Sequence, residues 1–216
     1  MELMERYRKA VEELLAKVRD TQTERIIEAG RMIADAVASG GKIYLSGICH
    51  SIEMDLITRG GGPLFYKHFD NGLESLKAGD VLIVSSVSGR TKSVVDLTVA
   101  AVEKGVKVIA FTSMEYAVQV DPVHESGKKL HEMVTLALDN CAPPAEAMLN
   151  VEGIEAHFAA CSGIASAYIM WSITSAAVEK MLADGYTPGI LKSDNFPGGR
   201  DYNKTVIEPN YEKYGY

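Results

Sequence analysis

The sequence predicts an α/β protein built on a doubly wound parallel sheet. Short apolar runs are each followed by a loop of small residues and then by a stretch with helical spacing. Residues 81–85 contain no charged side chain, as expected for a strand that is buried on both faces of a sheet. Strands that alternate with helices form parallel sheets through right-handed crossovers.

The expected elements follow one another in a regular order. Apolar residues recur at helical spacing over residues 2–38, which predicts one long helix, or two, ending at Gly40 and Gly41. Strands are expected at 42–46, 81–85, 106–112 and 134–138, with 64–66 as a weaker candidate. Further helices are expected at 52–59, from Thr91 to Gly105, and at 156–182.

Composition narrows the class of protein. With 216 residues and 47% hydrophobic content, the chain is long enough to bury the core of one domain. A net charge of -7 and a pI near 5.3 argue against a protein that binds nucleic acid or membranes through general electrostatic attraction. The three cysteines form no metal-binding or redox spacing, and neither a signal-peptide pattern nor a membrane-spanning run is present. We therefore expect a cytoplasmic protein.

One candidate binding loop follows the strand at 81–85. In an open parallel sheet, ligands bind outside the carboxyl ends of the strands, near the point where the strand order reverses. This loop combines hydroxyl groups with a glycine at the start of a helix, where unpaired N–H groups and the helix dipole favour a phosphate. The residues concerned are Ser86, Ser88, Gly89, Arg90 and Thr91. The alternative is that they only cap the helix.

A second candidate loop, residues 47–51, follows the first strand. Gly47 permits a tight turn, His50 can titrate near neutral pH, and Ser51 can cap the next helix or contact phosphate. Two carboxylates, Glu53 and Asp55, follow closely. Neither GxGxxG nor GxxxxGK[ST] is present, which disfavours dinucleotide binding and nucleotide hydrolysis.

The remaining histidines are less informative. His124 lies in a polar loop and is a candidate for the site or for a subunit contact, whereas His68 and His131 are expected at the surface and His157 is ambiguous. A metal site could be assembled from His50, a carboxylate and another histidine. No histidine pair has the i, i+4 spacing of a helical metal site, so we expect neither a metal nor a cofactor.

The pattern Ser86-Val-Ser-Gly-Arg-Thr91 resembles the SxSGxT signature of sugar isomerase (SIS) domains. Other stretches resemble a subgroup of uncharacterised SIS proteins described as phosphosugar or phosphoheptose isomerases. They are Gly47–Ser51, Arg59–Gly62, His124–Leu130, Asp139-Asn140 with Pro143-Pro144, and Ser193–Asn195 with Gly198-Gly199 and Tyr202-Asn203.

This resemblance implies a single SIS-type domain with a five-stranded, flavodoxin-like three-layer core. We expect a helical dimerisation segment at 1–39, the α/β core at 40–184, and a tail at 185–216 that packs near the site. It also implies a homodimer or homotetramer with a site near the subunit interface, and phosphate contacts from Ser51, Ser86, Ser88 and Thr91. The His/Glu zinc pattern of true phosphoheptose isomerases is absent from the segment after His50.

These observations favour an aldose–ketose isomerase that acts on a phosphorylated or similarly anionic sugar through an enediolate. Such a reaction needs a base and a group that handles protons at the sugar oxygens. We assign the base to Glu53 or Asp55, the oxygen protons to His50 with His124 as a second imidazole, and a sugar hydroxyl to Asn195. A sugar-phosphate sensor without turnover, a sugar-phosphate lyase and a degenerate anion-binding scaffold are the alternatives.

Overall fold

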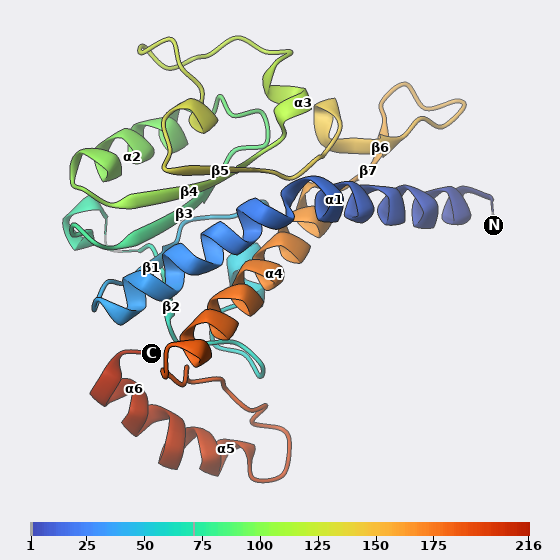
Figure 1. The fold of residues 1–216 in the computed structure, drawn as a ribbon. Coiled ribbons are helices and arrows are strands. Elements are labelled where there is room, and N and C mark those ends of the chain that lie inside the picture. Colours follow the sequence, from blue (N-terminus) through green and yellow to red (C-terminus); the bar gives the residue numbers. More distant parts are fainter. Residues whose placement is uncertain (1, 71) are drawn as a thin grey trace.

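The computed structural model describes residues 2–70 and 72–216 and confirms the predicted fold (Figure 1). A five-stranded sheet has the order β2-β1-β3-β4-β5, and every pair of neighbours is parallel. Its strands are β1 (Ile43–Leu45), β2 (Tyr66–His68), β3 (Val81–Ser85), β4 (Lys107–Thr112) and β5 (Leu136–Asp139). The strand order reverses between β1 and β3, so the loops that follow these two strands flank the switch point.

Helices bury both faces of this sheet, which explains why the strands are continuous apolar runs. Along β3, Val81 and Ile83 join the core under α1 (Glu2–Ala38) and α4 (Ser162–Ala183). The alternate residues of β3, Leu82 and Val84, pack on the other face with residues of α2 (Lys92–Glu103). Figure 1 shows α1 and α4 crossing the same side of the sheet.

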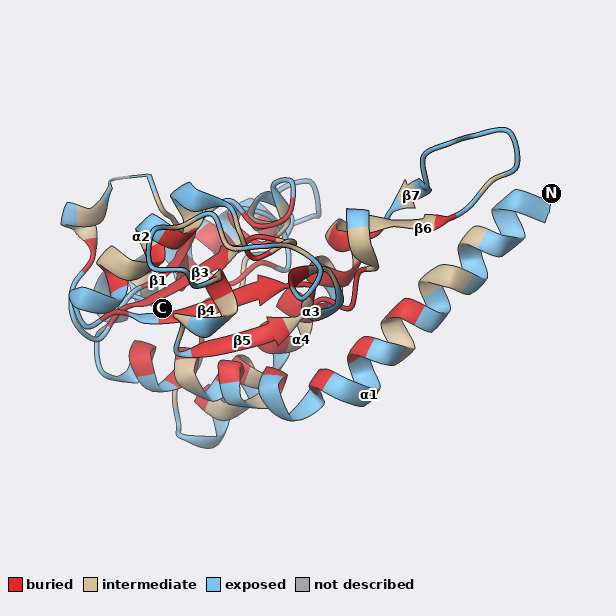
Figure 2. Cartoon of the chain, turned by 90° about the horizontal axis from the view of Figure 1, so that it is seen from above, coloured by how far each residue is buried: buried red, intermediate tan, exposed pale blue. Residues whose placement is uncertain are grey.

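Helices α1 and α4 approach each other closely at Gly30. A Cβ atom there would lie 2.6 Å from the Cβ of Ala176 and 2.9 Å from the backbone nitrogen of Ala177. Only glycine permits this contact, because real Cβ atoms do not approach other atoms so closely. The N-terminal part of α1 extends beyond the sheet, next to the hairpin of β6 (Ala147–Leu149) and β7 (Phe158–Ala160) (Figure 2).

Two expected helices differ in the structure. The segment expected as a helix at 52–59 contains only a 3-10 turn, Ile52–Asp55, because Gly60, Gly61 and Gly62 follow and leave too few residues to stabilise an α-helix. The helix expected at 156–182 begins at Ser162 instead. Residues 158–160 pair with β6, so His157 lies in the exposed part of the hairpin rather than near a helix start.

The tail is anchored on the segment that precedes β2. Its helical part consists of α5 (Gly199–Tyr202), a π turn (Asn203–Ile207) and α6 (Glu208–Tyr214). The backbone N–H of Leu191 donates to the carbonyl of Gly62 at 3.0 Å, and Asn203 forms hydrogen bonds with both the N–H and the carbonyl of Lys192. Within residues 2–70 and 72–216, no helix has the length and apolar character needed to cross a membrane.

Candidate functional site

The two candidate loops meet at the carboxyl edge of the sheet. The loop after β1 contains residues 47–51, and the loop after β3 contains residues 86–91. The loop after β1 contacts the end of β3, where the backbone N–H of Cys49 donates to Oγ of Ser85 at 2.8 Å. As predicted from the sequence, both loops therefore begin at the carboxyl edge of the sheet, on either side of the switch point.

The loop after β3 is folded by its own hydroxyl groups. Oγ of Ser86 lies 2.9 Å from Oγ1 of Thr91 and accepts the N–H of Thr91 at 3.3 Å. The N–H of Gly89 donates to the carbonyl of Ser86 at 2.9 Å, so this amide already has a partner. No acceptor among the described residues takes the N–H groups of Ser88 and Arg90. These amides, and those of Lys92 and Ser93 at the start of α2, leave donors for an anion.

Gly89 is packed against residues of β4 and of the segment that precedes β5. Its φ is +69°, and a Cβ atom there would lie 3.1 Å from Oγ1 of Thr112 and 3.6 Å from Nδ1 of His131. The N–H of Leu130 donates to the Gly89 carbonyl at 2.8 Å. His131 was expected at the surface, but its Nδ1 is buried, with no hydrogen-bond partner among the described residues. His131 therefore supports the anion loop from the interior side.

The loop after β1 has an unusual backbone. Three consecutive non-glycine residues, Cys49, His50 and Ser51, have φ values of 32°, 63° and 76°. This left-handed turn presents the His50 ring to solvent, with 83% of the side chain exposed, and leaves Ser51 exposed as well. Burial raises the pKa of the Cys49 thiol, which accepts a hydrogen bond from Ser166 at 3.1 Å, so this residue anchors the turn as a neutral thiol.

The two carboxylates after this turn differ in their contacts. Glu53 accepts the backbone N–H of Ile48 at 2.8 Å through Oε2. Asp55 uses both oxygens for structural contacts, one with Arg59 and the other with Nε1 of Trp171 at 3.0 Å. Of the two, Glu53 is the carboxylate that retains an oxygen without such a contact among the described residues, and it also closes the His50 loop.

His124 belongs to a different group of contacts, over α2. Its Nε2 lies 3.2 Å from Oδ1 of Asp96, and its Nδ1 lies 2.8 Å from Oγ of Ser126. Asp96, His124 and Glu125 place potential metal ligands within 4.8 Å of one another. However, the ammonium group of Lys92 already pairs with Asp96 at 2.7 Å and with Glu125 at 3.0 Å. The structure therefore gives the two carboxylates a cationic partner from the chain itself.

Asn195 lies apart from the two loops. It lines a hollow formed by the tail's own residues, together with Asp194, Phe196 and Arg200. The side chain is exposed.

The sequence interpretation missed Glu146. This residue follows β5, which also ends at the carboxyl edge, and its Oε2 lies 3.9 Å from Nε2 of His50. Ser162, the first residue of α4, donates its hydroxyl to the same oxygen at 2.8 Å. Burial and the Glu146 charge raise the pKa of the nearby Cys161 thiol to about 11. The only sequence signal was the carboxylate's position shortly after a strand and a Pro-Pro pair.

Comparison with known proteins decides the family. The SIS domain matches residues 6–68 and 63–113, half of the chain. The chain belongs to the SIS domain family. The UPF0309 protein of Streptomyces griseus is 33% identical over 224 residues, covering 90% of this chain and 89% of that protein. The predicted family, including its uncharacterised subgroup, is confirmed.

Solved SIS-fold structures agree with the architecture. A protein of E. coli CFT073, solved in complex with a ligand, is 17% identical, with a TM-score of 0.57 over 86% of this chain and 92% of that chain. The phosphoheptose isomerase of Neisseria gonorrhoeae is 16% identical, with a TM-score of 0.56 over 82% of this chain and 95% of that chain. At these identities the likeness establishes the SIS fold.

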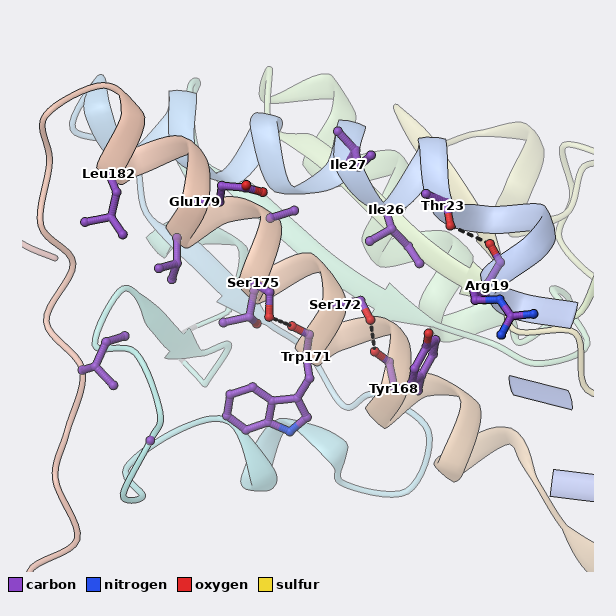
Figure 3. A pocket seen from close by; sticks show the side chains of 15 residues that line it. Arg19, Thr23, Ile26, Ile27, Tyr168, Trp171, Ser172, Ser175, Glu179 and Leu182 are labelled. Carbon is purple, nitrogen blue, oxygen red and sulfur yellow. Dashed lines mark hydrogen bonds between the residues drawn. The ribbon is translucent and has the colours of Figure 1, made fainter. Parts of the chain in front are cut away.

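A large groove lies away from the two loops, between α1 and α4 (Figure 3). Its volume is about 790 Å³, and its lining is largely apolar, including Ile26 and Ile27 of α1 and Tyr168, Val178 and Leu182 of α4. Leu182 is 54% exposed. The described residues that line this groove include no histidine, so we assign the chemistry to the loops at the carboxyl edge.

Proposed function

We propose that this SIS protein is an aldose–ketose isomerase that acts on a phosphorylated or similarly anionic sugar. The reaction moves a proton between C1 and C2 through an enediolate. One observation carries the proposal: the 2.8 Å hydrogen bond from the Cys49 N–H to Oγ of Ser85 ties the His50 loop to the last residue of β3, directly before the anion loop. This contact supports a site that holds an anion beside an imidazole, as an isomerase of this class requires.

The residues divide into two sets. Ser86, Ser88 and Thr91, with the amides around Gly89 and Arg90 and the hydroxyl of Ser51, hold the anionic group. His50 handles the protons at the sugar oxygens, and Glu53 is the base at carbon, because both oxygens of Asp55 are engaged elsewhere. His124 as a second imidazole and Asn195 as a hydroxyl contact remain predictions. The proposal requires no metal or cofactor.

We also propose that the chain forms a homodimer, or a homotetramer, through the face of α1 and α4. The apolar lining of the groove between these helices and the exposure of Leu182 support this assembly, since burying apolar surface favours association. Light scattering coupled to size-exclusion chromatography is expected to give a mass of two or four chains. A monomer at micromolar concentration would contradict the assembly.

Solvent exchange tests the function. The purified protein is screened by thermal shift against C4 to C7 sugar phosphates and sulfonated sugars. Each stabilising compound is then incubated with the protein in D₂O and followed by NMR. We expect deuterium at C1 or C2 and the appearance of a ketose, both lost in the variant His50→Asn. Asparagine tolerates the left-handed backbone of this turn, so this variant removes the imidazole with little backbone strain.

The other classes give different outcomes. Stabilisation without exchange identifies a sensor, and an unsaturated or cleaved product identifies a lyase. Either result rejects the isomerase. Absence of stabilisation by every compound rejects sugar-phosphate binding itself.

A further inference from the structure

Two backbone segments at the carboxyl edge have strained conformations. In the first, Cys49, His50 and Ser51 all have positive φ. In the second, Ala145 and Glu146 have φ values of 59° and 68°. A non-glycine residue in the left-handed region costs about 1–3 kcal/mol, and such strain persists where surrounding contacts impose it, often at active sites. Neither segment contains a glycine at these positions to relieve the strain.

The two strained segments face each other through one pair of side chains. Nε2 of His50 lies 3.9 Å from Oε2 of Glu146. The His50 side chain is 83% exposed, whereas that of Glu146 is 27% exposed, so the carboxylate forms the interior side of the pair.

Helix α4 fixes the carboxylate. The hydroxyl of Ser162 donates to Oε2 of Glu146 at 2.8 Å, and the N–H of Cys161 donates to the Glu146 carbonyl at 3.0 Å. Both the side chain and the backbone of Glu146 are therefore tied to the start of a helix of 22 residues. A carboxylate tied in this way to a long helix is suited to orienting an exposed imidazole.

We propose that Glu146 is a positioning residue for His50, and that Ser162 in turn orients Glu146. The proposal rests on the proposed isomerase function. Glu146 accepts the Nε2–H of His50, which leaves Nδ1 as the atom that exchanges protons with the sugar. A distance of 3.9 Å is too long for a hydrogen bond, but such contacts in an unliganded site commonly shorten when substrate binds.

Every proton removed in this step is returned to the sugar. While the carbon base takes the proton from C2 of the aldose and returns it to C1, Nδ1 of His50 takes the proton from the hydroxyl oxygen on C2 and delivers it to the carbonyl oxygen on C1. The transient imidazolium is stabilised by the Glu146 carboxylate, which stays ionised throughout. His50 and Glu146 end the cycle in their starting states.

The first test is made on protein saturated with a stabilising sugar phosphate, because the His50–Glu146 distance is too long for a hydrogen bond in the unliganded site. Long-range ¹H–¹⁵N NMR at alkaline pH reports which nitrogen of neutral His50 carries the proton, in wild type, Glu146→Gln and Ser162→Ala. We expect the Nε2–H tautomer in wild type and a mixture of tautomers in Glu146→Gln, with a smaller change in Ser162→Ala. Glu152→Gln, in the exposed part of the β6–β7 hairpin, is the matched control. The same tautomer in wild type and in both variants overturns the proposal.

The second test uses the compound for which wild type catalyses deuterium exchange. Glu146→Gln is expected to lower kcat by about tenfold to a hundredfold, the effect of partners that orient a functional imidazole, with KM changed little. Glu146→Asp should recover part of the rate, and the double variant with His50→Asn should be no slower than His50→Asn alone. Additive losses in the double variant overturn the proposal. Unchanged stabilisation of Glu146→Gln by inorganic phosphate shows that the anion loop is intact.

The two proposals fail in different ways. If wild type exchanges deuterium but its tautomer and kcat do not depend on Glu146, the positioning role is rejected and the isomerase stands. If wild type exchanges with no compound, the isomerase is rejected and the role of Glu146 in catalysis is rejected with it, whatever the tautomer. If the His50 tautomer still differs between wild type and Glu146→Gln in that case, the difference shows only that His50 and Glu146 are in contact.

Discussion

The two loops at the switch point are stabilised in different ways, and their proposed roles differ. The loop after β3 is closed by its own hydroxyl groups, with Ser86 bound to Thr91, and its glycine is supported by Leu130 and Thr112. The loop after β1 is held from outside, by Ser85, Glu53 and the start of α4, in a left-handed turn without glycine. An anion site benefits from fixed donors, because they need no reorganisation when the charge arrives. A proton-transfer group must instead reach the substrate and change its contacts during the cycle.

The largest effect is expected at His50. His50→Asn should lower kcat by about 10²–10⁴-fold, the usual contribution of a general acid–base group. Stability should change little, because the ring is exposed and asparagine accepts a left-handed backbone. Steady-state kinetics and thermal unfolding measure the two quantities. His157→Ala, which removes an exposed imidazole from the hairpin, should leave kcat unchanged.

An unchanged kcat in His50→Asn would contradict the assignment of proton transfer to the loop after β1. Both loops would then serve binding only, and the left-handed turn at residues 49–51 would need another explanation.

A smaller effect is expected at Gly89, in the self-closed loop. Gly89→Ala places a side chain at φ +69° and 3.1 Å from Oγ1 of Thr112, so we expect the free energy of unfolding to fall by about 1–3 kcal/mol. Displacing the loop should also weaken phosphate binding by about tenfold, the effect of losing one hydrogen bond to a charged group. Urea unfolding and phosphate titration measure the two losses.

Gly185→Ala is the matched control for Gly89→Ala. Gly185 has φ +85°, and a Cβ atom there would have no described neighbour within 4 Å, so its variant should lose stability but keep the phosphate affinity. Equal phosphate affinities for the two variants would show that the Gly89 loop does not hold the anion.

The sequence predicted those features that depend on neighbouring residues. The apolar run of β3 and the SxSGxT pattern that follows it are contiguous, so both the strand and the anion loop were recognised. Features that depend on tertiary contacts were not. Glu146 reaches His50 only because the ends of β1 and β5 share an edge and α4 begins beside them. The left-handed turn of Cys49, His50 and Ser51 was hidden for another reason, since none of these residue types demands a positive φ.

The burial of the His131 Nδ1 atom was likewise not predictable from the sequence. The charged residues Lys129 and Glu132 lie close to His131 in the sequence, yet the backbone contact between Leu130 and Gly89 places the ring beside the anion loop. The choice between Glu53 and Asp55 also required the structure. Their spacing in the sequence is nearly equivalent, but only Asp55 is reached by Arg59 and by the indole of Trp171.

The smallest effect is expected at Asp55. This residue tests whether the contacts that follow the His50 turn are structural only. Asp55→Asn keeps an oxygen that can accept the Trp171 N–H but loses the ion pair with Arg59, which is half exposed. Because exposed pairs at i, i+4 contribute about 0.3–0.5 kcal/mol, the loss of stability should be of that order, with kcat unchanged. Glu53→Gln should instead lower kcat sharply, since an amide cannot take a proton from carbon. If Asp55→Asn loses the activity and Glu53→Gln retains it, the base lies on the supporting side of the turn, and the Arg59 and Trp171 contacts are part of the catalytic machinery rather than of the scaffold.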